Sequence, residues 1–161
     1  MSRARKLLVF GGISLAVFGM LYGLHYAIFI EHQTLDRLGG SLATAFVHGA
    51  ERKLPEAHAA LEAYGSTKYD YVRQVDAHSH WIGLAMLMMV MGVVFDSVGF
   101  SERVRYLIAW GLVLGGVVFP LGVLLQTQTH GGALASAMAI AGSGLVVASL
   151  AAIAVGFARQ T

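Results

Sequence analysis

Residues 77–95, AHSHWIGLAMLMMVMGVVF, form an uncharged run of 19 residues that decides the fold class of this chain. As an α-helix, such a run extends about 28 Å, close to the roughly 30 Å hydrocarbon core of a bilayer. Three further apolar runs, at 7–30, 106–125 and 133–158, are also long enough to cross. Because lipid offers backbone groups no hydrogen-bond partners, we expect an all-α, integral membrane four-helix bundle that forms a single domain.

The composition supports membrane insertion rather than a soluble globule. The 161 residues are 57% hydrophobic and 12% charged, whereas soluble domains carry about 25% charged residues. The lipid bilayer is therefore the first expected partner. The basic residues form no continuous stripe, so nucleic-acid binding is not expected. The chain has no cysteine, which excludes disulfides, iron–sulfur clusters and thiolate metal sites.

The positions of lysine and arginine predict the orientation of the four spans. Six of these residues flank the inner ends of the runs, while the turn at 126–132 has none. They are Arg3, Arg5, Lys6, Arg103, Arg105 and Arg159. Because cytoplasmic loops are enriched in Lys and Arg, both termini are predicted to be cytoplasmic. The expected membrane is a bacterial inner membrane. Residues 31–76 then face the periplasm.

The outer segment, residues 31–76, is predicted to be helical. Apolar side chains repeat at helical spacing in both halves: Leu35, Leu38, Leu42 and Phe46, then Leu54, Leu61 and Tyr64. Pro55 suits a first helical turn, and Gly65 is expected to end that helix. We therefore expect two short amphipathic helices that cap the outer face of the bundle. A third helical stretch, from Ser66 or Thr67, is expected to continue into the second span.

The histidines suggest a site near the outer membrane surface. All seven are expected on that side: His25, His32, His48, His58, His78, His80 and His130. Helix rise places His25 about 28 Å above Lys6, and His80 about 24 Å above the inner end of its span. Imidazole is the commonest metal ligand, and an ionisable group at membrane depth is a functional candidate. We predict a metal or cofactor site with His25 and His80 as ligands, and His78 and His130 as further candidates.

Spacing limits how these residues act together. His78 and His80 differ by about 200° around a helix, so they are expected on opposite faces and do not bind one metal. Asp76, four residues before His80, is placed to orient that imidazole. The alternative is that His80 is an interfacial residue beside Trp81 and that His78 is solvated.

Two tyrosines, Tyr22 and Tyr26, flank His25 and are predicted to hydrogen-bond around it. Burying an unpartnered neutral imidazole costs on the order of 2 kcal/mol. His25 is therefore either a metal ligand or hydrogen-bonded to a neighbouring helix or a tyrosine. His130 is either a further ligand or an ordinary loop residue near a helix start.

The H-x-H pattern opens the second helix, in DAHSHWIGL at 76–84, and follows a first helix rich in glycine (Gly11, Gly12, Gly19 and Gly23). This arrangement resembles the small four-helix membrane proteins related to haem–copper oxidase subunit I, over the four spans. The resemblance implies a low-spin haem ligated by His78 or His80. No later helix carries the histidine cluster of a binuclear haem–copper centre, so oxygen reduction is not expected.

Three functions remain open at this point. The first is a redox or cofactor-handling protein that holds a single haem b, or alternatively copper, at its outer face. The second is a non-catalytic accessory or assembly subunit of a membrane respiratory or transport complex, or a homo-oligomer. Gly19-x-x-x-Gly23 and Gly111-x-x-x-Gly115 permit the close helix contacts that such a role needs. A metal or proton transporter is less favoured, because no acidic residue lies inside a span.

Overall fold

The computed structural model describes residues 1–159, and these residues form helices and short connections. The helices are α1 (Arg3–Phe29), α2 (Glu31–Ala50), α3 (Leu54–Val94), α4 (Glu102–Thr129) and α5 (Ala133–Ala158), with a 3-10 turn η1 (Phe95–Ser97). No strand occurs in the described range, so the all-α prediction is confirmed. Four helices, α1, α3, α4 and α5, are long and apolar enough to cross a membrane.

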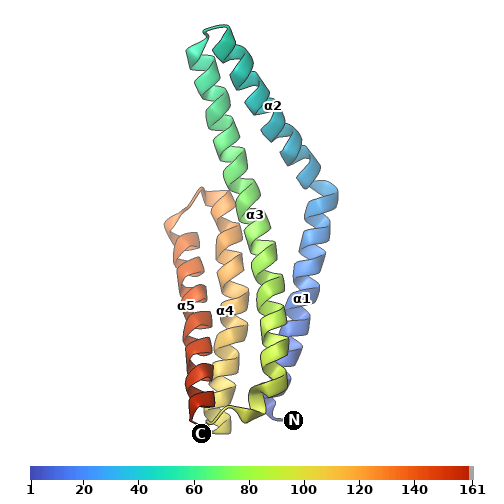
Figure 1. Cartoon of the computed structure of the whole chain (residues 1–161), viewed down its shortest axis with the longest axis vertical. Helices are drawn as coiled ribbons and strands as arrows, with labels where there is room; N and C mark the ends of the chain where they lie inside the picture. Colours follow the sequence, from blue (N-terminus) through green and yellow to red (C-terminus); the bar gives the residue numbers. More distant parts are fainter. Residues whose placement is uncertain (160–161) are drawn as a thin grey trace.

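Helix α3 lies at the centre of the membrane part, packed against α1 and α4, while α5 packs on α4 (Figure 1). Glycines make these contacts close. A Cβ at Gly115 would lie 2.8 Å from the carbonyl oxygen of Gly142, and a Cβ at Gly142 would collide with the backbone of Phe119. Such small-residue contacts are typical of helix pairs in membranes, where lipid tails are as apolar as the side chains.

The core is small, and much apolar surface faces outward. The largest fully buried side chains include Trp81, Phe95, Leu8, Met88 and Leu112. Exposed apolar residues cover the outer faces of the membrane-spanning helices, as in Met20, Leu107 and Ile140. A helix that is apolar on all sides is stable in lipid but not in water. The exposed faces therefore agree with membrane-spanning helices.

A polar cluster fixes the end of the bundle that holds the N-terminus. The Ser2 hydroxyl accepts a hydrogen bond from Arg5 N at 3.2 Å and donates to the carboxylate of Asp96. The carboxylate of Glu102 accepts a hydrogen bond from Arg3 N at 2.9 Å. Donors at the first turn of α1 are thereby satisfied by the α3–α4 connection. This cluster sets the height of α1 relative to α3 and α4.

The outer segment differs from the prediction. Instead of two short helices lying over the bundle, α2 and the first half of α3 form an antiparallel hairpin that extends beyond the ends of α4 and α5 (Figure 1). Gly65, predicted to end a helix, lies inside the 41-residue α3. One glycine costs about 1 kcal/mol in a helix interior. A helix end there would leave up to four carbonyls and four amides unpaired, so the continuous helix is favoured.

Candidate functional site

His78 has a defined seat against α1. Its Nδ1 lies 3.0 Å from the carbonyl oxygen of Gly19, and its ring lies over Gly23, where a Cβ would collide with it. A carbonyl only accepts, so Nδ1 carries the proton and donates, which leaves a lone pair on Nε2. The two glycines of Gly19-x-x-x-Gly23 therefore create the space and the acceptor that hold this imidazole.

His80 faces a different neighbour. Its half-buried ring lies 4.5 Å, centroid to centroid, from Phe119 of α4. The prediction that His78 and His80 point to different faces is confirmed, since one contacts α1 and the other α4. Asp76 makes no hydrogen bond to His80 within residues 1–159, so its predicted orienting contact is not formed here.

His25 lies at the predicted end of α1, but its side chain is exposed and its ring is 5.2 Å from that of Phe29 on the same helix. The flanking tyrosines point inward instead. The Tyr22 ring packs edge-on against Trp81 at 5.2 Å, and the Tyr22 hydroxyl lies 3.5 Å from Gln74 Oε1. Neither tyrosine is hydrogen-bonded to His25 in the described chain. The pairing of His25 with His80 stays a prediction, and their rings contact Phe29 and Phe119 in this arrangement.

Tyr26 occupies the elbow where α1 meets α2. Its side chain is 6% exposed, and its hydroxyl is buried without a hydrogen-bond partner in the described chain. An unpaired buried hydroxyl is costly. The junction of α1 and α2 therefore contains a buried hydroxyl without a hydrogen bond to the described chain.

His130 ends α4 in a left-handed conformation, with φ of 45°. Its ring is nearly parallel to that of Tyr69, with centroids 6.4 Å apart, and its Nε2 lies 3.5 Å from the Ser66 hydroxyl. These contacts join the α4–α5 connection to the outer half of α3. His130 therefore links the α4–α5 connection to α3. Its role as a ligand stays a prediction.

The side chains that could bind a metal fit haem better than copper. Within residues 1–159, no three His, Asp or Glu side chains are grouped to hold a metal ion. A three-ligand copper site does not fit this arrangement. Haem iron needs only one or two axial ligands from the protein. His78 meets one further requirement, because a metal-binding imidazole normally donates its other N–H to a carbonyl or carboxylate.

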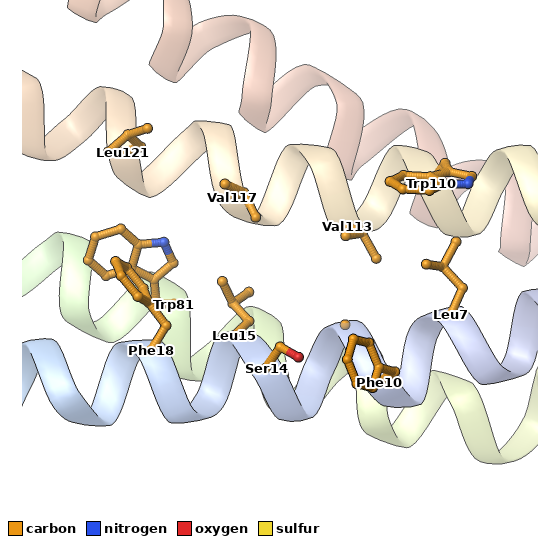
Figure 2. Close-up of a pocket in the computed structure, with 11 residues that line it drawn as sticks. Leu7, Phe10, Ser14, Leu15, Phe18, Trp81, Trp110, Val113, Val117 and Leu121 are labelled. Carbon is orange, nitrogen blue, oxygen red and sulfur yellow. The ribbon is translucent and has the colours of Figure 1, made fainter.

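A second feature was not predicted from the sequence. A groove of about 460 Å³ runs between α1, α3 and α4 at membrane depth (Figure 2). It is lined by Leu7, Phe10, Gly11, Ser14, Leu15, Phe18, Trp81, Trp110, Val113, Val117 and Leu121. Both tryptophans of the chain are among these residues. Their placement at two depths of neighbouring spans is the sequence signal that could have indicated the groove.

The chain matches no protein-family model, no curated protein sequence and no solved structure. The contacts of its own residues therefore carry the functional interpretation.

Proposed function

We propose that this chain is a non-catalytic accessory or assembly subunit of a membrane respiratory or transport complex, and that the α2–α3 hairpin is its docking element. The four membrane-spanning helices hold the hairpin at one surface of the bilayer. The observation that carries the proposal is the uncovered apolar surface of the hairpin, which a partner protein would bury.

The hairpin has almost no core of its own. Between Glu31 and Asp76, the buried side chains are Ala45 and Ala57. Larger apolar side chains point outward, with Phe46 72% exposed and Leu54 61% exposed. Two helices alone cannot bury enough surface to form a stable domain in water. Large apolar side chains left exposed on such a hairpin are suited to a protein–protein contact.

The positions of the two chain ends and of the hairpin tip support one orientation of the protein in the membrane. The start of α1 and the end of α5 lie at one end of the bundle, and the tip of the hairpin lies at the other (Figure 1). The six Lys and Arg residues that flank the spans are near the first of these ends. By the positive-inside rule, we place the termini in the cytoplasm of a bacterial inner membrane and residues 31–76 in the periplasm.

The test compares the native size of the protein in mild detergent with that of a hairpin variant. The unmodified chain is expected to migrate within a larger complex containing a different membrane protein. Phe46→Glu is expected to release it, since the exposed phenyl ring contributes to the contact rather than to folding. Gln33→Glu, which adds the same charge at another exposed position of α2, is the matched control.

Two results would contradict the proposal. One is an unmodified chain that stays monomeric in native membrane extracts. The other is a homodimer without any further protein, which would make the hairpin a self-association element. Replacing all seven histidines should leave the complex intact, provided that the protein still folds without the His78 hydrogen bond.

A second function is a haem b protein with His78 as an axial ligand, and one observation favours it. The Nδ1–H of His78 is held on the Gly19 carbonyl, so Nε2 is the ring nitrogen that would bind iron. His80, His25 and His130 are the other candidates for ligation. Bound haem would supply one-electron transfer. Copper is the less favoured alternative, because the described residues offer no three-ligand group.

Absorption spectroscopy of the purified protein tests the haem function. A Soret band is expected that His78→Ala removes, while His58→Ala, an exposed position on the hairpin, leaves it unchanged. A folded, colourless protein after haem supplementation would contradict it. So would a Soret band that survives all four candidate His→Ala substitutions.

A further inference from the structure

The groove between α1, α3 and α4 has the size and lining of a binding site, and it lies apart from the α2–α3 hairpin. Four aromatic rings line it, from Phe10 and Phe18 on α1, Trp81 on α3 and Trp110 on α4. The remaining walls are almost entirely aliphatic. At about 460 Å³, the groove lies within the range of small-molecule sites.

Three hydrogen-bond donors line this groove and have no acceptor among residues 1–159: the indole N–H groups of Trp81 and Trp110, and the Ser14 hydroxyl. Trp81 is 1% exposed, whereas Ser14 and Trp110 are exposed. Trp81 and Ser14 are the nearer pair, and Trp110 lies farther along the groove (Figure 2). Because hydrocarbon chains offer no acceptor, a bound molecule with two acceptors would pair with Trp81 and Ser14.

The Trp81 ring is held in place. It packs edge-on against Phe18 at 4.8 Å and against Tyr22 at 5.2 Å, centroid to centroid. In Figure 2, the nitrogen-bearing edge of the indole is on the side of Val117 and Leu15, which line the groove. The donor is therefore oriented before any ligand arrives.

The two donors lie at different heights. Trp81 contacts α1 at Gly19, since a Cβ there would lie 3.1 Å from the Trp81 Cβ. Ser14 precedes Gly19 by five residues, which corresponds to about 7 Å along the helix axis. The separation suits two oxygens on opposite sides of one ring better than a single oxygen.

We propose that the groove binds a lipid-soluble quinone, whose two carbonyl oxygens accept hydrogen bonds from Trp81 Nε1–H and the Ser14 hydroxyl. The aromatic side chains would contact the planar head, and the aliphatic walls would contact its isoprenoid tail. A lipid acyl chain is the competing occupant. It uses neither donor and has no planar ring for the aromatic side chains to contact.

The test measures binding of decylubiquinone to the full chain in phosphatidylcholine nanodiscs, through quenching of tryptophan fluorescence. Saturable quenching is expected, since Trp81 and Trp110 both line the groove. Ser14→Ala is expected to weaken binding about fivefold to tenfold, the loss of one hydrogen bond. Trp81→Phe should weaken it similarly, with Trp110 as reporter. Ser143→Ala, whose hydroxyl donates to the Ile140 carbonyl at 2.9 Å on α5, is the matched control and should bind normally.

Three outcomes would overturn the proposal. Quenching that does not saturate would show that the groove holds no quinone. Equal competition by decylbenzene, which has the ring and chain but no carbonyl, would assign the groove to hydrocarbon chains. Binding by Ser14→Ala that equals that of Ser143→Ala would remove the hydrogen bond from the argument, even if Trp81→Phe fails to fold.

Discussion

Gly23→Ala provides the sharpest test of the α1–α3 contact. The added Cβ would lie 2.7 Å from Nδ1 and 3.1 Å from Nε2 of His78, so the imidazole has to move off its seat. Moving the ring breaks its hydrogen bond to the Gly19 carbonyl. A lost hydrogen bond of this kind costs about 1 kcal/mol and the overpacking about 1–3 kcal/mol. Alanine recovers about 1 kcal/mol of helix propensity, so we expect a net loss of about 1–3 kcal/mol.

The assay is equilibrium unfolding in detergent, followed by circular dichroism. Gly83→Ala is the matched control, because a Cβ at Gly83 meets no atom within 4 Å, and this variant should be as stable as the parent or slightly more stable. His78→Ala should cost less in the Gly23→Ala background than in the parent, since the methyl group then fills vacated space. Equal stabilities of Gly23→Ala and Gly83→Ala would refute the reasoning.

Three further predictions follow from the contacts. Gly142→Ala should destabilise the protein by about 1–3 kcal/mol in the same assay, because the added Cβ would meet the backbone of Phe119 across the α4–α5 contact. Gly144→Ala is the control, since a Cβ there lies in open space, and equal effects of the two variants would contradict the close contact. Ser2→Ala should cost about 1 kcal/mol through loss of the α1 cap, measured as a lower unfolding midpoint, and an unchanged midpoint would contradict the cap. Asp36→Asn should change stability by less than about 0.5 kcal/mol, since its 3.5 Å contact with His32 is exposed, and a larger loss would show that the contact is covered.

The spans were predictable because hydropathy and length are properties of the sequence alone. The uncharged run 77–95 lies within the second half of α3, and the other three runs lie on α1, α4 and α5 as expected. Helix rise also predicted that His25 and His78 lie near the outer ends of their spans. These predictions use distance along a helix axis, which needs no tertiary information.

Direction around the helix axis was harder to predict. The offset of two residues correctly separated His78 from His80. His25, however, is exposed beside Phe29, while Tyr26 next to it is buried. In an apolar span, lipid-facing and protein-facing positions carry similar residues, so the sequence pattern does not reveal which face packs inward.

The hairpin and the groove depend on interactions between elements. Gly65 is a plausible helix end by local propensity, yet backbone hydrogen bonding continues through it in α3. The groove forms because α1 and α4 approach each other at some heights and not at others. Gly11 contacts Val113, whereas space remains near Ser14. Such spacing is set by packing in three dimensions.

The most direct test of the docking role is photocrosslinking in intact membranes from position 46. A photoreactive amino acid at Phe46 should give one discrete adduct with a different membrane protein. The same group at Gln33, about 220° away around α2, should give none. No adduct from position 46, or an adduct only with a second copy of this chain, would contradict the account.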